Sequence, residues 1–416
     1  MAMTGRLVSL ESRDFRLYYT GQIVSNVGTH MQQVALTWQL YLLTHSPLAL
    51  GLLGAFKALP VLVFALGGGV VADAVDRRKL MIATQGTMAL ASATLLVATW
   101  MGAMAPWLIY AATALAAVAL AFDRPAAGAL VPRLVPREHL SNALSLNVMG
   151  WQAAAVAGPA IGGMLVGAGA SLAVYAFDVV SFLAYIGMLL AIRNPALAPE
   201  GGGSVSLRAA LEGLRFIAGN RLILSTMVLD FLAMFLGGAL LLMPIFADQV
   251  LHVGAQGLGL LYGAQPAGAA LAGAYLAVGP KLRRHGEVFL WTLAIYGAAI
   301  AAFGASTWLP LSLLALAISG AADTVSTVIR ATLRQLLTPD EMRGRMTSVG
   351  MIFFIGGPQL GEVEAGVVAK FFGAPLSVIS GGVACLLLPV LAALLLPELR
   401  RYTEEEALQR AAALAA

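Results

Sequence analysis

Residues 48–79 read LALGLLGAFKALPVLVFALGGGVVADAVDRRK. Lys57 is the only charged residue between Leu48 and Ala72, and a dense group of charges follows in residues 73–79. A helix needs about 20 predominantly apolar residues to cross the hydrocarbon core of a bilayer. This stretch therefore predicts a transmembrane helix that ends in a charged turn at the membrane surface.

The same pattern recurs along the whole chain. Hydrophobic residues make up 59% of the 416 residues, charged residues only 11%, and the mean hydropathy is +0.84. A soluble protein carries far more charge on its surface. We therefore predict an all-α membrane protein with about twelve transmembrane helices. The predicted spans cover residues 15–42, 48–73, 80–101, 107–130, 143–167, 172–192, 221–247, 256–279, 287–305, 308–331, 346–371 and 376–396.

The positive charges predict how the chain is oriented. Apart from Arg16 and Arg221 at the very start of their spans, only Lys57, Arg124, Arg330 and Lys370 of the 25 Lys and Arg residues lie inside or at the edge of a predicted span. The others lie in the two termini and in the connections that follow even-numbered spans. Because Lys and Arg concentrate in cytoplasmic segments, we expect both termini on the cytoplasmic side of the inner (plasma) membrane.

A polar segment divides the predicted spans six and six. Pro195, Pro199 and the glycines at 201–203 indicate a linker, and apolar residues at helical spacing then predict a short amphipathic helix. The predicted domains are an N-terminal six-helix bundle (1–192), a cytoplasmic linker with the short helix (193–220), a C-terminal six-helix bundle (221–397) and a cytoplasmic tail (398–416).

The two halves resemble each other in sequence. GPAIG at 158–162 recurs as GPQLG at 357–361, and Asp123 has a counterpart in Asp323. An internal repeat at an offset of about 200 residues indicates two pseudo-symmetric bundles around a central site, as in many secondary transporters.

Several functions are excluded by what the sequence lacks. It has no G-x-x-x-x-G-K-[ST] phosphate loop, no Ser-His-Asp arrangement on a soluble segment and no basic cluster interleaved with aromatics. Cys385 is the only cysteine, which excludes an internal disulfide and is best explained by packing. We therefore expect no enzyme activity, no metal, no cofactor and no nucleic-acid partner.

The connection after the second span is the most specific motif. Residues 69–79 read GVVADAVDRRK, which resembles the signature loop of the major facilitator superfamily, G-x-x-x-D-(R/K)-x-G-(R/K)-(R/K). The residues that carry the resemblance are Gly69, Asp73, Arg77, Arg78 and Lys79. The resemblance implies that Asp73 takes part in a cytoplasmic contact that holds the two halves together in one state of the cycle. The alternative is an ordinary turn whose positive charges anchor it in the cytoplasm.

Two residues depart from that signature. Ala74 stands where the family often has Arg, and Asp76 stands where it has Gly. Asp76 is familiar from one branch of the family, which contains the enterobactin exporter and related drug and macrolide efflux proteins. Residues 14–28 and 132–142 (PRLVPREHLSN) are similar to that branch as well.

The fifth predicted span carries a second motif. Ala154-x-x-x-Gly158-Pro159-Ala160-Ile161-Gly162-Gly163 resembles the g-x-x-x-G-P-x-x-G-G motif found in proton-coupled exporters of this family. The resemblance implies export. Small residues at this spacing also allow close helix contact, and proline favours a bend, so generic packing is the alternative.

Charged residues inside the spans are candidates for coupling or gating. Each is costly in the bilayer and is expected to face a cavity or a partner. Asp123, Arg124 and Asp323 lie near the cytoplasmic surface, where we expect a gate network with the loop of Asp73. The deeper candidates for ion or substrate coupling are Lys57, Asp230 and Glu362. A further acid, Asp178, lies in the outer part of the sixth span.

Uncharged polar residues form a stripe on the first span. Gln22, Asn26, Thr29 and Gln33 follow helical spacing and would line one face, with Gln32 beside it. Such a face suits a cavity for a neutral or amphipathic solute, although hydrogen bonding between helices is the alternative. Trp151 and Tyr262 lie deep enough to stack on a ligand.

The resemblance and the topology together predict a secondary transporter. We expect a monomer in the lipid bilayer that exports a small amphipathic compound, such as a siderophore, macrolide or drug, by alternating access in exchange for protons. The alternatives are an importer or symporter of a small solute, and a non-transporting membrane sensor on the same scaffold.

Overall fold

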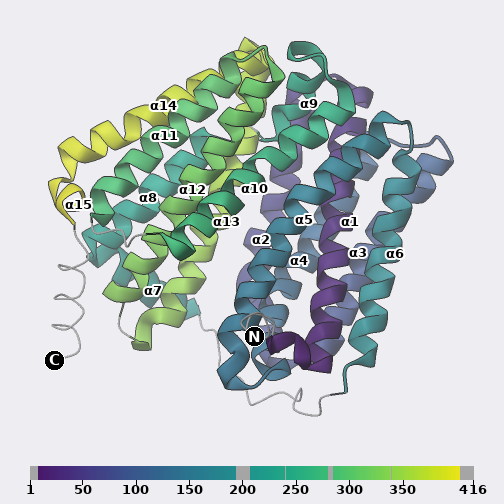
Figure 1. The fold of residues 1–416 in the computed structure, drawn as a ribbon, viewed down its shortest axis with the longest axis horizontal. Coiled ribbons are helices and arrows are strands. Elements are labelled where there is room, and N and C mark those ends of the chain that lie inside the picture. The colour runs from purple at the N-terminus through teal and green to yellow at the C-terminus, as the bar shows by residue number, and fades with distance from the viewer. Residues whose placement is uncertain (1–7, 194–206, 239, 280–283, 339, 403–416) are drawn as a thin grey trace. The chain divides into compact units, whose positions relative to one another are not determined.

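The computed structural model describes residues 8–193, 207–238, 240–279, 284–338 and 340–402, and every element in these ranges is a helix (Figure 1). Six long helices come from the first half of the chain: α1 (Arg13–Thr44), α2 (Pro47–Ala74), α3 (Arg77–Trp100), α4 (Pro106–Leu134), α5 (Leu140–Gly167) and α6 (Ser171–Ala191). The short 3-10 helices Val8–Glu11 and Arg137–His139 precede α1 and α5.

The second half begins with the short helix α7 (Leu207–Gly219), which packs against α13. The longer helices are α8 (Arg221–Leu236), α10 (Gly254–Val278), α11 (His285–Ala305), α12 (Leu309–Leu337), α13 (Asp340–Phe372) and α14 (Ala374–Leu395). The short helical segments are Leu240–Leu242, α9 (Met243–Ile245), a π-helix at Phe246–Val250 and α15 (Pro397–Arg401).

The seventh predicted span is interrupted. We predicted one helix over residues 221–247, but α8 ends at Leu236, and short 3-10, α and π segments follow from Leu240 to Val250. Gly237 and Gly238 are poor helix formers because glycine loses the most backbone freedom on folding. Gly237 also packs against α11, since a Cβ there would lie 2.6 Å from the Tyr296 hydroxyl.

Polar side chains begin several of the helices where the sequence changes from polar to apolar. Ser12 accepts a hydrogen bond from the Phe15 amide at the start of α1, and Asn220 accepts one from Ile223 at the start of α8. These side chains satisfy backbone amides that have no partner inside the helix.

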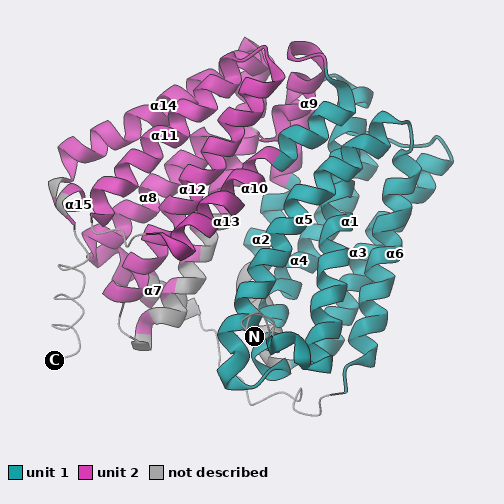
Figure 2. Ribbon diagram, in the orientation of Figure 1, with its two compact units in different colours: residues 1–45, 56–205, 253–263 teal, residues 46–55, 206–252, 264–416 magenta. Residues whose placement is uncertain are grey.

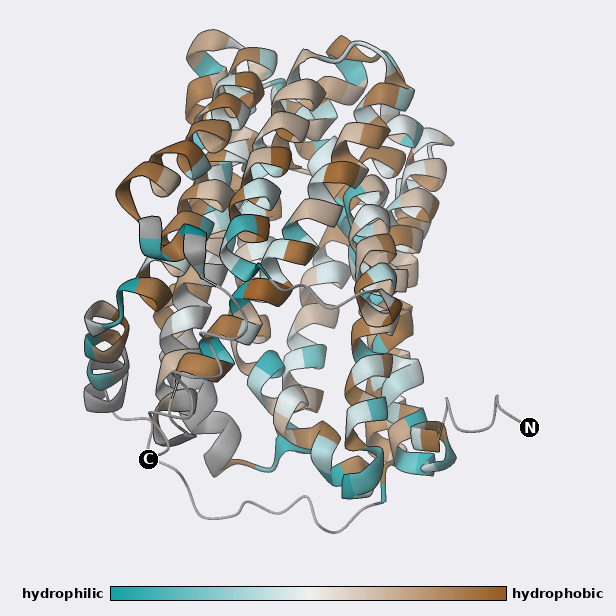
Figure 3. Cartoon of the chain, turned by 60° about the vertical axis from the view of Figure 1, so that its left-hand side comes forward, coloured by the Kyte–Doolittle hydropathy of each residue, from teal (hydrophilic) through white to brown (hydrophobic). Residues whose placement is uncertain are grey.

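Nine helical segments of the described chain are long and apolar enough to cross a membrane. Large hydrophobic side chains remain exposed along them, and hydrophilic residues gather in the connecting turns (Figure 3). The three long helices outside this set are α1, with its polar stripe, and α10 and α13. The full count of twelve spans therefore stays a prediction.

The chain forms two compact units (Figure 2). Unit 1 comprises residues 1–45, 56–205 and 253–263, and α1 and α3 both pack against α6 in it. Unit 2 comprises residues 46–55, 206–252 and 264–416, and its α11 packs against α12 and α14. The start of α2 thus belongs to unit 2, and the start of α10 belongs to unit 1.

Candidate functional site

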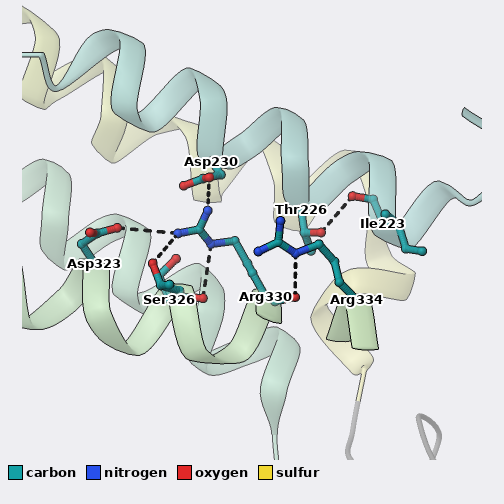
Figure 4. Close-up of polar contacts among 8 residues, drawn as sticks. Ile223, Thr226, Asp230, Asp323, Ser326, Arg330 and Arg334 are labelled. Carbon is teal, nitrogen blue, oxygen red and sulfur yellow. Dashed lines mark hydrogen bonds and ion pairs between the residues drawn. The ribbon is translucent and has the colours of Figure 1, made fainter. Parts of the chain in front are cut away.

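The main cluster of buried charge among the described residues lies in unit 2 on α8 and α12. Figure 4 shows the Arg330 guanidinium between two carboxylates. Arg330 Nη1 forms an ion pair with Asp230 Oδ2, and Arg330 Nη2 lies 3.6 Å from Asp323 Oδ1. The side chains of Arg330 and Asp230 are only 5% and 11% exposed, whereas that of Asp323 is 34% exposed. Arg330 therefore connects an enclosed carboxylate to one whose side chain is more exposed.

The rest of the Arg330 side chain is also fixed by hydrogen bonds. Its Nε donates to the carbonyl oxygen of Ser326 at 3.3 Å, and Nη2 donates to Thr327 Oγ1 at 2.8 Å. Arg334, one turn further along α12, donates from Nε to the Arg330 carbonyl at 3.3 Å. A planar guanidinium with this many partners is held in one orientation.

A small pocket opens beside the ion pair. Its lining comes from α8 (Thr226, Met227 and Asp230), α12 (Arg330 and Arg334) and α13 (Gly350 and Phe353). Asp230 and Arg330 therefore both line an opening between three helices. A proton that binds either carboxylate would remove one of the two negative charges beside Arg330. It would thereby weaken the electrostatic attraction between that carboxyl and the guanidinium.

The ion pairs group the candidate residues in a way that we did not predict from the sequence. We expected Asp323 in a gate network with Asp123 and Arg124, and Asp230 in a separate coupling site. Arg330 joins Asp230 and Asp323 in one cluster. The gate network of Asp123, Arg124 and Asp323 with the loop of Asp73 stays a prediction. From the sequence we located Arg330 inside a span but predicted no partner for it. Asp230, an acid inside another span, was the residue that could have suggested one.

In unit 1, Asp123 on α4 is bound by neutral donors. Thr84 Oγ1 donates to Asp123 Oδ1 at 2.7 Å, and Gln85 Nε2 donates to the same oxygen at 3.1 Å. The neighbouring Arg124 is exposed and forms no ion pair with Asp123 in the described part of the chain. Asp123 therefore attaches α4 to α3 through hydrogen bonds.

In the connection after α2, the structure describes side chains only from Val75 onward. Gly69 and Asp73 lie in the last turns of α2, where side chains fall outside the described residues, so the predicted contact of Asp73 stays a prediction. Asp76 has a defined role as the N-cap of α3, where Oδ1 accepts from the amides of Arg78 (2.9 Å) and Lys79 (3.3 Å). The residue that departs from the family signature thus begins the third helix.

The basic residues of this loop differ in their surroundings. Arg78 Nη2 donates to the Leu190 carbonyl at 2.5 Å, at the C-terminal end of α6. A cation there compensates the partial negative charge of the helix end. Arg77 is half-buried, and Lys79 is exposed.

The glycines of the fifth span permit close contacts within unit 1. A Cβ at Gly158 would lie 2.6 Å from the Cβ of His30, and one at Gly162 would lie 2.8 Å from the Cα of Met31, both on α1. A Cβ at Gly163 would lie 2.7 Å from the Cα of Gly259 at the start of α10. Pro159 is buried in the same helix. The motif therefore brings two helices against α5.

The polar stripe on α1 has mixed surroundings. Gln22 Nε2 donates to the Tyr18 hydroxyl at 3.0 Å within the helix, whereas Thr29 is exposed and Asn26 and Gln33 are half-buried. The hydrogen bond to another helix comes from Gln32, beside the stripe, whose Nε2 donates to Ser92 Oγ on α3 at 2.7 Å.

The remaining candidates do not form one site. Trp151 is 47% exposed and packs edge-on against His30, and the Tyr262 hydroxyl donates to Thr37 Oγ1 at 3.3 Å. Lys57 is half-buried on α2. Glu362 is buried on α13 beside the start of α2, where a Cβ at Gly54 would lie 2.8 Å from the Glu362 Cβ.

Comparison with known proteins identifies the family. The sequence profile of the transmembrane secretion effectors of the major facilitator superfamily matches residues 4–414. This chain belongs to that family. The enterobactin exporter EntS of Escherichia coli O1:K1 / APEC is 27% identical over 393 residues, which cover 94% of this chain and 93% of the exporter.

Solved structures share the fold. A POT family transporter in complex with 5-aminolevulinic acid superposes with a TM-score of 0.75 at 11% identity, covering 93% of this chain and 97% of the transporter. A bacterial homologue of the human lysosomal transporter Spinster, in an inward-facing and unoccupied conformation, gives 0.69 at 15% identity, covering 96% and 99%.

The family fixes the general class of this protein. It is a multi-pass membrane transporter of the major facilitator type and not an enzyme, as the sequence predicted. The buried ion pair of unit 2 therefore lies inside a transporter.

Proposed function

We propose that this chain exports a small amphipathic compound by alternating access and that proton uptake drives the export. The observation that carries the proposal is the buried Arg330, which pairs with Asp230 on another helix and with Asp323 on its own. Buried ionisable groups in membrane proteins are costly and usually mark an ion or substrate pathway.

The ion pair supplies an element with two arrangements. With Asp230 ionised, its attraction to Arg330 holds α8 against α12. A proton on Asp230 removes that charge, and Arg330 keeps only Asp323, the more exposed carboxylate. A change of partner by one guanidinium favours a different packing of the two helices, which is how a local protonation can shift a transporter between two states.

Three features support export of an amphipathic solute. The likeness to an enterobactin exporter suggests a siderophore or another compound of similar character. The Gly158–Gly163 segment resembles the motif of proton-coupled exporters, and the amides of α1 offer hydrogen bonds to a neutral solute. We further propose that the protein works as a monomer in the inner membrane.

Transport into inverted membrane vesicles tests the proposal. An imposed proton gradient, acidic inside, should drive accumulation of a hydroxamate or catecholate siderophore or of a macrolide, and Asp230→Asn should abolish the dependence on the gradient. The matched control is Glu287→Gln, because Glu287 forms an exposed ion pair with Arg284 at 3.3 Å in the same unit.

Other outcomes would point to the alternatives. Accumulation in right-side-out vesicles alone would indicate an importer. Gradient-independent transport in the unaltered protein would overturn proton coupling. Absence of flux in both vesicle orientations for the tested compounds would leave the export proposal contradicted for those classes and favour a sensor.

The orientation can be tested in whole cells. We propose that the termini face the cytoplasm, so the α4–α5 connection should as well and the α3–α4 connection should face outward. An impermeant maleimide should label Ala103→Cys and not Glu138→Cys, both of which are exposed positions. The native Cys385 is buried and serves as the background control. The reverse labelling would overturn the orientation.

A further inference from the structure

Asp178 on α6 is the most deeply buried carboxyl group among the described residues. As a whole residue it is 0% exposed, compared with 8% for Asp230 and 9% for Glu362. It lies in unit 1 and has no part in the ion-pair cluster described above. A carboxyl group so far from solvent needs partners that compensate either a charge or a proton.

The hydrogen-bond partners of Asp178 are few and neutral. Ser92 Oγ on α3 lies 2.6 Å from Asp178 Oδ2, and Gln32 Nε2 on α1 lies 2.7 Å from Ser92 Oγ. Asp178 Oδ1 has no hydrogen-bond donor among the described residues. It faces the bare backbone of Gly28, where a Cβ would lie 2.8 Å from Oδ1.

No positive charge faces Asp178 from the helices that pack against α6. Those helices are α1, α3 and α5. They contain no Lys, Arg, Asp or Glu within residues 17–44, 80–100 and 140–167. An ionised Asp178 would therefore be a charge without a counter-ion, which is among the costliest arrangements in a protein interior.

The other titratable groups nearby are engaged elsewhere. His30 of α1 packs edge-on against Trp151 of α5, with ring centroids 5.7 Å apart. The Tyr175 hydroxyl, one turn from Asp178 on α6, donates to Gln39 Oε1 at 2.7 Å. Tyr185, two turns along α6, packs edge-on against Tyr18. None of these groups carries a positive charge to Asp178.

We propose that Asp178 is a proton-binding site that holds one proton as a neutral carboxylic acid between α1, α3 and α6. The proton comes from water and sits on Oδ2, which donates to Ser92 Oγ. Ser92 then donates to the side-chain oxygen of Gln32, whose amide oxygen and nitrogen are interchangeable at these positions. The heavy-atom distances stay the same, and only a carbonyl oxygen, Oδ1, remains without a donor. The inference concerns the resting protein and holds whether or not transport is coupled to protons.

Infrared spectroscopy of the purified full-length protein tests this assignment. At neutral pH the carbonyl stretch of a carboxylic acid is separate from the bands of carboxylates and shifts in D₂O. Asp178→Asn should remove one carboxylic-acid band. Asp230→Asn, which alters a carboxylate paired with Arg330, should remove carboxylate intensity instead and serves as the matched control. Loss of a carboxylate band in Asp178→Asn would overturn the proposal.

A second variant keeps the test decisive if Asp178→Asn does not fold. Ser92→Ala leaves the carboxyl in position but removes its hydrogen-bond partner. The carboxylic-acid band should then move to higher frequency, as expected for a weaker hydrogen bond. An unchanged carboxylic-acid region in a folded Ser92→Ala protein would overturn the proposal as well.

Discussion

The two units compensate their buried carboxyl groups in different ways. In unit 2, Arg330 compensates Asp230 and Asp323 by charge. In unit 1, Asp123 accepts hydrogen bonds from Thr84 and Gln85, Asp178 is hydrogen-bonded to Ser92, and neither carboxyl forms an ion pair with a described residue. Asp123 and Asp323 occupy corresponding positions of the internal repeat. The repeat alone therefore does not predict that one acid is paired with an arginine and the other with neutral donors. Arg330 has no basic counterpart in unit 1, where the equivalent region of α4 contains Leu130.

This difference has a consequence for how each unit responds to protons. A carboxylate beside a guanidinium changes its partner when it is protonated, which alters the attraction between two helices. A carboxyl group that is hydrogen-bonded to a neutral hydroxyl keeps the same heavy-atom contact whether or not it is protonated, because the hydroxyl can either donate or accept. On the two proposals made above, unit 2 is the unit in which a proton would change helix packing most directly, and the protonated form of Asp178 would stabilise unit 1.

Removing Arg330 should have the largest effect. Arg330→Met leaves Asp230 buried without a counter-ion, and we expect a loss of about 3–5 kcal/mol in the free energy of unfolding. Thermal unfolding in detergent measures it. The exposed Arg284→Met is the control and should cost less than about 1 kcal/mol.

A second change should partly reverse that loss. In the double variant Arg330→Met, Asp230→Met the enclosed charge is absent, and the remaining carboxylate, Asp323, has the more exposed side chain of the two. The double variant should therefore be more stable than Arg330→Met alone. Equal stability of the two would show that the ion pair does not determine the packing of α8 on α12.

The direct comparison of the two buried acids should give a smaller effect. Asp230→Asn weakens a charge-assisted hydrogen bond to Arg330, for which we expect a loss of about 1.5–3 kcal/mol. Asp178→Asn replaces a neutral acid by a neutral amide of the same shape and should cost less than about 1 kcal/mol. Thermal unfolding of the two variants side by side measures the difference. If Asp178→Asn proves the more destabilising variant, the contrast between the units is wrong.

The smallest effect concerns single hydrogen bonds in unit 1. Ser92→Ala removes the contact of α3 with Asp178, and hydrogen bonds between membrane helices are worth about 0.6 kcal/mol on average. Ser181→Ala is the matched control, because Ser181 Oγ donates only to the Asp178 carbonyl of its own helix at 2.7 Å. Thermal unfolding should detect a loss for Ser92→Ala that exceeds the loss for Ser181→Ala.

The membrane class was predictable because it depends on composition summed over many residues. The run 48–72, in which Lys57 is the only charged residue, and the charges after it required no knowledge of tertiary contacts. The break after Leu236 was visible in principle, since Gly237 and Gly238 are adjacent, but their neighbours Leu240–Leu242 kept the hydropathy high. Hydropathy reports whether a segment is apolar and not whether its backbone is helical.

The partners of the buried charges could not be predicted in the same way. Asp230 and Arg330 are far apart in sequence, and each alone indicates only that some partner exists. Asp178 was visible as an acid in the sixth span, but Ser92 and Gln32 are polar residues like many others in their helices. Which of them meet depends on the rotation of each helix, which the periodicity of a weakly amphipathic helix leaves open.

The end of α6 is held from two sides. Arg78 contacts the Leu190 carbonyl, and the Arg193 amide donates to Asp14 Oδ1 at the start of α1, at 3.4 Å. The chain therefore leaves its first half from an anchored exit, attached both to the α2–α3 connection and to the first long helix. A displacement of the α2–α3 connection would therefore also move the C-terminal end of α6, from which the chain continues toward its second half.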